Sequence, residues 1–320
     1  MQFFQKSEEQ IRIEQKLQRI NAAKQEEKYR KPNPCQVTFP EENFIEMKVQ
    51  QEGKLIKLNT YRFQANGKPK AVIFMFHGLC AHINHCAHIA QKMAQDGFLV
   101  VGFDNRGFGK SEGIRGYLES LEIHLSDCRL FMQKVLELQG NSNIPVFLSG
   151  LSMGGMTSFR LAIQGNIPNL RGIILYAPAI KTLFSNLQIN TIKFVGYIIP
   201  KYKLIKPKRG QTTKNPQVTE DLMKDPYTYS DELLPKTIST ITVSMKECES
   251  MYGQLQTPWI VIQGGLDKLV DPDLAFTLQK ESPSKDKTVL YYENLWHDVW
   301  HEEEIHDIIP KVIQWLNQRI

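Results

Sequence analysis

The chain has 320 residues, of which 42% are hydrophobic and 23% charged, and its formal net charge at pH 7 is +5. This is an ordinary globular composition, sufficient for one large domain with an insertion or for two modest domains. The mild charge, without a concentrated basic patch, argues against a nucleic-acid-binding surface. No stretch approaches 18 uninterrupted apolar residues, so no membrane-spanning helix is predicted.

Cysteine usage and the N-terminal composition indicate the compartment. The five cysteines include no CxxC pair and no close, even framework, which favours free thiols in a reducing environment. The N-terminus carries Glu8, Glu9 and Glu14 and lacks an apolar core with a cleavage site, so no signal or transit peptide is predicted. We therefore expect a cytoplasmic protein, and peripheral contact with membranes stays open.

Residues 1–35 are predicted to form an N-terminal helical extension. The segment is strongly polar, but Ile13, Leu17 and Ile20 form a narrow apolar stripe at helical spacing, and two prolines end the pattern. The stripe fits either a solvated helix that lies on the body or a docking arm for a protein partner.

The next segment, FIEMKVQQEGKLIKLNTYRF, alternates apolar and polar residues around Glu52-Gly53, which predicts a β-hairpin. A repeated unit follows, in which a short apolar run, a turn and an amphipathic segment succeed one another. Six runs are nearly continuous in hydrophobic residues, as in strands buried on both faces of a parallel sheet: 71–76, 98–103, 145–150, 171–177, 258–264 and 288–293. Amphipathic stretches fit crossover helices: 85–95, 125–139 and 274–282. The pattern predicts an α/β fold with a mainly parallel central sheet, helices on both sides and the hairpin at one edge.

The repeated unit is interrupted in residues 180–257, which contain no buried-strand run. We predict a helical cap or lid here, inserted between two parts of the core, residues 36–179 and 258–320. The insertion carries a stretch rich in Leu, Ile and Phe, which Lys193 interrupts. A basic cluster follows it: Lys201, Lys203, Lys206, Lys208 and Arg209.

The strongest motif is VFLSGLSMGGMTSF, where Gly150, Ser152 and Gly154 form G-x-S-x-G between a buried-strand run and a helical pattern. A nucleophilic serine must project from a tight strand-to-helix turn, whose crowded backbone requires small residues two positions before and after it. The following helix directs its N-terminal amides at the same point, where they can stabilise an oxyanion. The placement favours a nucleophilic Ser152 over a surface turn.

A serine hydroxyl is a poor nucleophile until a base takes its proton, so a carboxylate and then a histidine are expected after later strands. Asp267 lies just past one predicted strand, and His297 lies just past the last one. Asp271 competes for the role of the acid, but a proline follows it, and it fits a helix N-terminal cap better. His301 competes for the role of the base, although it falls in or next to the final helix.

Four histidines and two cysteines fall in the segment HGLCAHINHCAH, which raises the question of a metal site. A metal needs at least three ligands that converge on one point. Only His85 and His88 are adjacent on the predicted helix, whereas His82 precedes it and His77 ends a strand. The sequence therefore predicts neither a metal nor a cofactor.

The same segment follows the first buried parallel strand, where an acyl-transfer site takes the second backbone N–H of its oxyanion hole. The expected pair of donors is the amide of Leu79 and the amide of Met153, the residue after the serine.

Taken together and in order, these motifs resemble the monoglyceride lipase-like α/β-hydrolases, also catalogued as the serine aminopeptidase S33 (Hydrolase_4) hydrolases. The resemblance runs from about residue 45 to the end. The matching segments are FHGLCAH for the oxyanion loop, GFDNRGFGKSEG after the next strand, LSGLSMGGM around the serine, GGLDKLVDP for the acid and LWHDVWHEEE for the base.

The resemblance implies an α/β-hydrolase fold and hydrolysis of a carboxylic ester, typically a monoacylglycerol or lysophospholipid, through an acyl-serine intermediate. It implies that Ser152 attacks, His297 carries the proton and Asp267 orients the imidazole. Residues 180–257 are then the family's lid, which admits an acyl chain. Its lysines either meet anionic headgroups at a membrane or are merely solvated.

The family commonly shows His-Gly-x-Gly-Glu-His in the oxyanion loop, whereas this chain has Cys80 and Ala81 at the second Gly and the Glu. Recognition of glycerol is therefore left open. Arg106 is expected to anchor its loop rather than to catalyse. Ser152 argues against the related enzymes that use an aspartate nucleophile, and no acidic pocket for a peptide N-terminus is recognisable. The alternative function is a non-catalytic subunit of a larger assembly, docked through the N-terminal helix.

Overall fold

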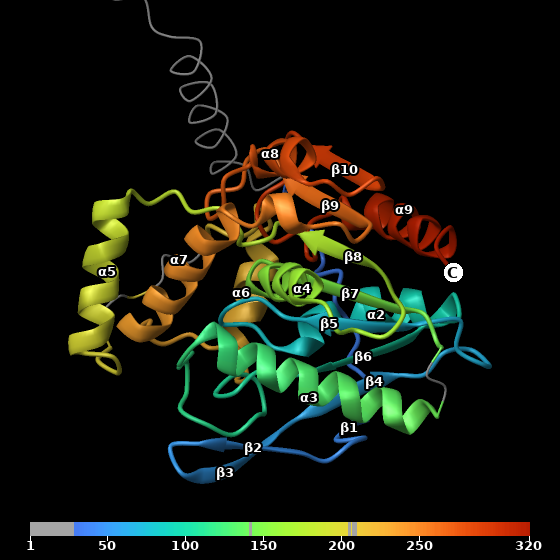
Figure 1. Ribbon diagram of the computed structural model, residues 1–320, viewed down its shortest axis with the longest axis horizontal. Helices are drawn as coiled ribbons and strands as arrows, with labels where there is room; N and C mark the ends of the chain where they lie inside the picture. The colour runs from blue at the N-terminus through green and yellow to red at the C-terminus, as the bar shows by residue number, and fades with distance from the viewer. Residues whose placement is uncertain (1–28, 141–142, 204–205, 207–209) are drawn as a thin grey trace, which may run out of the picture.

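A central eight-stranded sheet organises the chain (Figure 1). The computed structural model describes residues 29–140, 143–203, 206 and 210–320. The strand order is β1-β4-β6-β5-β7-β8-β9-β10, and the strands from β6 onward in this order run parallel. The parallel strands are β5 (Val72–Phe76), β6 (Leu99–Phe103), β7 (Val146–Leu151), β8 (Leu170–Tyr176), β9 (Trp259–Gly264) and β10 (Lys287–Tyr292).

Each of the six predicted apolar runs forms one of these parallel strands, and the bounds differ by at most one residue. Strands β5, β6, β7 and β9 are buried along their whole length, as expected for a sheet covered on both faces. The prediction of full burial was wrong for β10, whose six residues are all half-buried. This strand is the last in the sheet order and pairs with β9 alone.

The predicted hairpin is formed by β2 (Met47–Gln51) and β3 (Lys54–Leu58), which pair antiparallel. The turn residues Glu52 and Gly53 both have a positive φ, 48° and 77°, as a two-residue hairpin turn requires. The hairpin forms a separate two-stranded sheet and does not pair with the edge of the central sheet. That edge is completed instead by two antiparallel strands, β4 (Thr60–Phe63) and β1 (Glu41–Glu42).

Helices cover both faces of the sheet. Phe74 and Met75 are neighbours on β5, and because side chains alternate along a strand they face opposite sides. The Phe74 ring packs against Phe131 of α3, with ring centroids 5.9 Å apart, whereas the Met75 sulfur lies 3.9 Å from that of Cys86, just before α2. Helices α3 and α4 share one face and α2 and α9 the other (Figure 1). The core helices are α2 (Ala87–Gln95), α3 (Leu121–Gln139), α4 (Met153–Gln164), α8 (Leu274–Glu281) and α9 (Ile305–Asn317).

The described part of the chain between β8 and β9 contains helices and no strand. These are α5 (Asn186–Ile198), α6 (Pro216–Lys224), α7 (Pro235–Glu249) and the short 3₁₀ helix η3 (Tyr252–Gln254). Helix α5 packs closely on α7, because a Cβ on Gly196 would lie 2.7 Å from that of Ser239. Helix α5 is the outermost element of this region, at the left of Figure 1. The boundaries at residues 180 and 257 stay a prediction.

Of the predicted N-terminal helical extension, residues 1–35, the part with the apolar stripe falls in residues 1–28, which lie outside the described residues. The described chain begins on the surface of α6, where the Arg30 guanidinium pairs with the Glu220 carboxylate at 2.8 Å. The Asn215 side chain also donates a hydrogen bond to the Lys31 carbonyl at 2.9 Å. Among the described residues, no helix has the length and apolarity that would let it cross a bilayer.

The four tryptophans lie in the C-terminal part of the core, and each is at most 4% exposed: Trp259, Trp296, Trp300 and Trp315. Trp315 packs on Phe147 of β7, and a Cβ on Gly172 would lie 2.4 Å from its ring. Trp300 packs edge-on against Tyr176 at the end of β8. Large aromatic side chains therefore join α9 and the loop before it to the sheet.

Replacing Phe131 with alanine is expected to destabilise the fold by about 3–5 kcal/mol, because its ring is fully buried between those of Phe74 and Phe103. Chemical denaturation measures the free energy of unfolding. The matched control is Leu138→Ala on the same helix, whose side chain is 54% exposed and whose loss is expected to cost little. Equal effects of the two substitutions would contradict this description of the core.

Candidate active site

Ser152 occupies the sharp turn between β7 and α4, as its motif predicts. It is the N-cap residue of α4 and has φ 55° and ψ −113°, a strained conformation for a residue other than glycine. A Cβ on Gly154 would lie 2.0 Å from the Phe76 carbonyl oxygen, and one on Gly150 would lie 2.2 Å from the Gly154 carbonyl carbon. Both positions therefore require glycine, and Ser152 is held out at the carboxyl edge of the sheet.

The loop after β5 lies directly beside this serine. A Cβ on Gly78 would be 3.6 Å from the Ser152 Cβ. His77 fixes the loop, because its Nε2 accepts a hydrogen bond from the Asn105 amide at 3.0 Å and its Nδ1 lies 2.8 Å from the Gly78 carbonyl oxygen. Burial lowers the pKa of His77 to about 3, so this histidine is neutral and serves the loop's structure.

The backbone conformation of Cys80 explains why the family commonly has glycine at this position. Its φ is 66°, in the left-handed region that glycine adopts without steric cost. Its carbonyl accepts a hydrogen bond from the Tyr229 amide at 2.9 Å. The loop after β5 is thereby joined to the helical insertion by its backbone.

Asp267 and His297 form a buried pair behind the serine turn. The Nδ1 atom of His297 lies 2.8 Å from the Asp267 carboxylate, whose other oxygen accepts hydrogen bonds from the amides of Leu269 and Val270. Burial disfavours the charged imidazole, but the charge and hydrogen bond of Asp267 outweigh it and raise the pKa of His297 above its usual value. The carboxylate thus favours a charged imidazolium.

The two rival residues have other partners. The Asp271 carboxylate pairs with Lys181 at 2.8 Å and accepts from the Asp273 amide, and Asp273, not Asp271, is the N-cap residue of α8. The expectation that Asp271 caps this helix was therefore wrong by two residues. His301 lies in a turn before α9 and bonds with Asp298, at 2.9 Å from its Nδ1 to each carboxylate oxygen.

Arg106 anchors its loop, as expected, because its guanidinium pairs with the Asp127 carboxylate of α3, at 2.6 Å for Nη2, and donates to the Gln50 carbonyl. In the same loop, Asp104 accepts hydrogen bonds from the Ile83 amide and the Tyr61 hydroxyl, both at 2.9 Å. These contacts hold the oxyanion-loop region against β6.

A cavity of about 480 Å³ lies over the serine turn, and Ser152, His297, Leu79 and Met153 all line it. Met153 is the first residue of α4, whose first amides have no partner within the helix. Apolar side chains from the insertion cover much of the wall: Leu222, Met223, Leu233, Ile241 and Met245. The cavity thus brings Ser152 and His297 together with a largely apolar wall.

Sequence reasoning missed the contacts that the insertion makes with the loop after β10. The Asp298 amide donates to the Thr212 carbonyl at 2.7 Å, and the Lys214 amide donates to the Glu302 carboxylate at 2.8 Å. No local pattern marks these residues, because their partners lie more than 80 positions away in the chain.

A mainly parallel sheet covered on both faces, with a serine on a strand-to-helix turn at its carboxyl edge, defines an α/β-hydrolase. The Hydrolase_4 family, described as serine aminopeptidase S33, matches residues 67–304, and the chain belongs to this family. The predictions of the fold class and of this family are both confirmed.

Relatives cover most of the chain. Monoglyceride lipase of Rattus norvegicus is 28% identical over 264 residues, which are 81% of this chain and 86% of the relative. Phospholipase YtpA of Bacillus subtilis is 26% identical over 264 residues, 79% of this chain and 97% of the relative. A soluble variant of monoglyceride lipase from Saccharomyces cerevisiae, solved with a substrate analogue, superposes with a TM-score of 0.76 at 19% identity, covering 90% and 97% of the two chains.

The substitution Asp267→Asn is expected to lower the pKa of His297, because it removes the negative charge that opposes the effect of burial. NMR titration of the histidine ring protons measures this value. Asp271→Asn is the matched control, since Asp271 pairs with Lys181, and should leave the His297 titration unchanged. A larger effect of Asp271→Asn on the pKa of His297 would assign the role of the carboxylate to Asp271.

Proposed function

We propose that this chain is a serine hydrolase that cleaves carboxylic esters of lipid-like substrates, monoacylglycerols or lysophospholipids, through an acyl-serine intermediate. The observation that carries the proposal is the meeting of Ser152 and His297 in one largely apolar cavity, with Asp267 buried behind the imidazole. The relatives named monoglyceride lipase and phospholipase support ester hydrolysis of lipids as the activity.

In the first half of the reaction, the Ser152 hydroxyl oxygen bonds to the ester carbonyl carbon while its proton passes to Nε2 of His297. Asp267 holds Nδ1 of the imidazole and favours the cation that forms. The negative charge on the carbonyl oxygen is stabilised by the amides of Leu79 and Met153. The bond to the alcohol then breaks, and the alcohol leaves with the proton from His297.

In the second half, a water molecule gives a proton to His297 and bonds to the acyl carbon. The bond between that carbon and the Ser152 oxygen breaks, the serine regains its proton from the imidazole, and the fatty acid is released. No cofactor enters either half.

The side chains that line the cavity favour an acyl chain over a polar substrate. The insertion supplies a wall of leucine, isoleucine and methionine side chains, against which a chain of methylene groups is removed from water. Met side chains such as Met223 and Met245 adapt to ligands of different shape. We infer that residues 180–257 act as the cap of the acyl pocket.

Ser152→Ala is expected to lower hydrolysis of a medium-chain p-nitrophenyl ester by about 10⁴-fold or more while the melting temperature stays nearly unchanged. Measuring wild type and Ser152→Ala with a monoacylglycerol and with a lysophospholipid as substrates identifies the alcohol that the reaction releases. Ser250→Ala, at an exposed position, is the matched control and should retain full activity. Retained turnover by Ser152→Ala would place the nucleophile elsewhere.

A fluorophosphonate probe tests the alternative of a non-catalytic subunit. Covalent labelling of Ser152 in the folded chain is expected, because a hydrolase serine with a working base reacts with this reagent. A folded protein that stays unlabelled would favour the assembly role.

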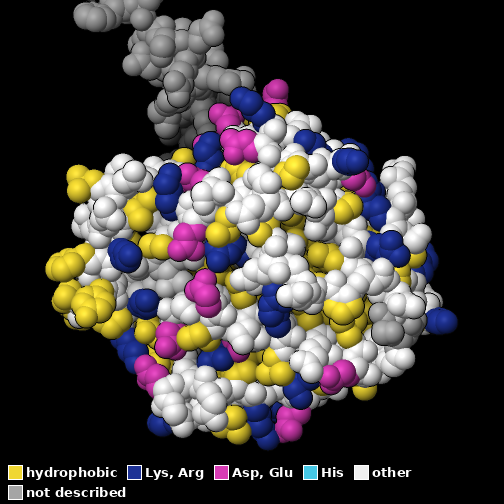
Figure 2. Space-filling model, viewed as in Figure 1, with side chains coloured by type: hydrophobic (Ala, Val, Ile, Leu, Met, Phe, Trp, Pro, Cys, Tyr) yellow, Lys and Arg dark blue, Asp and Glu magenta, His cyan; other side chains and the backbone are white. Residues whose placement is uncertain are grey.

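We also propose that the cap touches a membrane through α5 and the segments on either side of it. Large apolar side chains are strongly exposed here: Leu183, Phe184, Leu187, Phe194, Tyr197, Ile198 and Tyr202. Figure 2 shows hydrophobic side chains gathered at its left edge, where Figure 1 shows α5. An apolar patch of this kind next to an acyl pocket suits a protein that takes its substrate from a lipid surface.

The basic cluster after α5 contributes less charge than the sequence suggests. Lys201 pairs with Glu52, and Lys203 pairs with Asp231 at 2.8 Å. Lys206 is exposed, and the last two members of the cluster lie outside the described residues. Membrane contact is therefore proposed to depend mainly on the apolar side chains.

The double substitution Phe194→Asp and Tyr197→Asp is expected to weaken binding to neutral lipid vesicles by about tenfold or more, because each aromatic side chain contributes roughly 1.5–3 kcal/mol when buried. Vesicle co-sedimentation measures binding, and hydrolysis of a short soluble ester should stay unchanged. Leu138→Asp, exposed on α3, is the control. Equal binding by the double variant and wild type would rule out this surface.

A further inference from the structure

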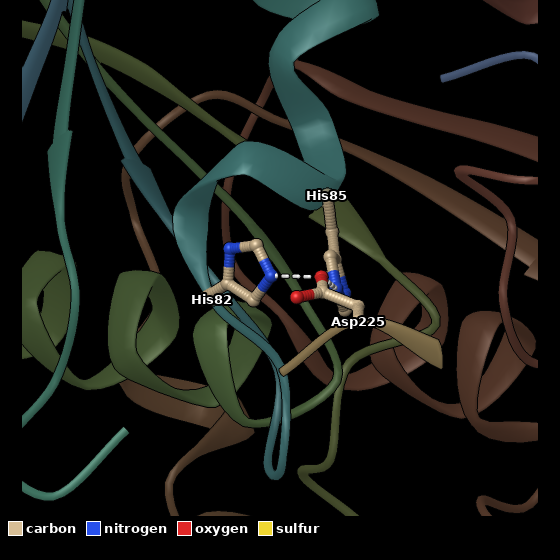
Figure 3. A group of neighbouring side chains, drawn as sticks. All are labelled: His82, His85 and Asp225. Carbon is tan, nitrogen blue, oxygen red and sulfur yellow. Dashed lines mark hydrogen bonds and ion pairs between the residues drawn. The ribbon is translucent and has the colours of Figure 1, made fainter. Parts of the chain in front are cut away.

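Two histidines of the oxyanion-loop segment meet a carboxylate of the insertion. Nε2 of His82 lies 2.6 Å from Oδ2 of Asp225, and Nε2 of His85 lies 3.6 Å from the same oxygen (Figure 3). One ligand atom from each of the three residues lies within 4.8 Å of the other two. Three groups that commonly bind transition metals therefore converge on one point.

The backbone after the oxyanion loop explains the convergence. Residues Ile83–Cys86 form the 3₁₀ helix η2, with His82 at its N-cap, and α2 begins only at Ala87. Side chains three positions apart eclipse in a 3₁₀ helix, so the His82 and His85 rings lie side by side, with centroids 4.2 Å apart and planes tilted by 58°. A regular helix from residue 84 would instead pair His85 with His88.

We propose that His82, His85 and Asp225 bind a single divalent transition-metal ion of the Zn²⁺ class. Two imidazole nitrogens and one carboxylate oxygen are a ligand set that zinc takes with four-coordinate geometry. The fourth position is filled by water or by the Thr228 hydroxyl, whose oxygen lies 3.0 Å from Nε2 of His85 and 3.3 Å from Oδ2 of Asp225. The segment HGLCAHINHCAH supplies two of the three ligands, and Asp225 of the insertion supplies the third.

For the two pairs that each histidine forms with Asp225, a bound ion requires only a small adjustment. Tetrahedral ligand atoms about 2.0–2.1 Å from a zinc ion lie roughly 3.3 Å apart. The separation of 3.6 Å between His85 and Asp225 is close to this value, and the 2.6 Å between His82 and Asp225 must widen by less than about 1 Å. Asp225 lies at the C-cap of α6 with a quarter of its side chain exposed, so it can move by this amount.

Neighbouring histidines are engaged elsewhere. His301 bonds with Asp298, and Nε2 of His88 lies 2.8 Å from the Trp300 carbonyl oxygen. The proposed ion would therefore connect the oxyanion-loop segment to the cap beside Thr228 and His85, which both line the cavity. This proposal does not depend on the hydrolytic reaction.

The test uses the full-length chain without a polyhistidine tag, freed of metal with a chelator. Calorimetric titration with Zn²⁺ is expected to show one ion per chain, and Co²⁺ should give the visible absorption of a four-coordinate site. His82→Gln and Asp225→Asn should each weaken Zn²⁺ binding at least about tenfold, the lower bound for loss of an outer-sphere group. His306→Gln, at an exposed position on α9, should bind as wild type does.

Absence of Zn²⁺ binding by the wild type would overturn the proposal. So would Zn²⁺ binding by His82→Gln and Asp225→Asn that is as tight as that of His306→Gln. Anomalous diffraction from wild-type crystals soaked in Zn²⁺ locates the ion without any substitution, which keeps the test decisive if a variant fails to fold. A peak between His82, His85 and Asp225 is expected, and a peak only elsewhere would also overturn it.

Discussion

Close backbone contact at the serine turn is the constraint on which the rest of the site depends. The Phe76 carbonyl at the end of β5 occupies the space that a side chain on Gly154 would need. Strand β5, strand β7 and the start of α4 are therefore locked together at one point, and Ser152 is left in a conformation that an unconstrained chain would avoid. The loop after β5 starts from the same carbonyl region, so its distance from the serine is set by the same contact.

A second close contact fixes Asp267 and His297 relative to each other. A Cβ on Gly264, at the end of β9, would lie 2.3 Å from the Leu295 carbonyl oxygen, two residues before His297. The loops after β9 and β10 are thus packed backbone to backbone, and the bond between Asp267 and His297 spans only this contact. Both contacts lie where parallel strands end, which is the edge at which such sheets bind ligands.

The sequence predicted the parallel strands almost to the residue, because continuous apolar runs bounded by turns are a strong local signal. It also selected Asp267 and His297 over Asp271 and His301, and only the former two bond to each other. Its errors concern features that depend on distant contacts. Strand β10 is half-buried because no strand in the described part of the chain pairs on its outer side. The approach of Asp225 to His82 joins positions 143 residues apart, beyond any local pattern.

The placement of the tryptophans has an optical consequence. All four indoles are buried after residue 258, in the same part of the chain as Asp267 and His297, and Trp300 lines the cavity. Intrinsic tryptophan fluorescence of this protein therefore reports on the neighbourhood of Asp267 and His297 and, through Trp315, on the packing of α9 against β7. Strands β5 and β7 carry no tryptophan of their own. The emission of the folded protein should be blue-shifted relative to that of the unfolded chain, because the indoles are buried. A ligand in the cavity that quenches Trp300 would be detected without any added label.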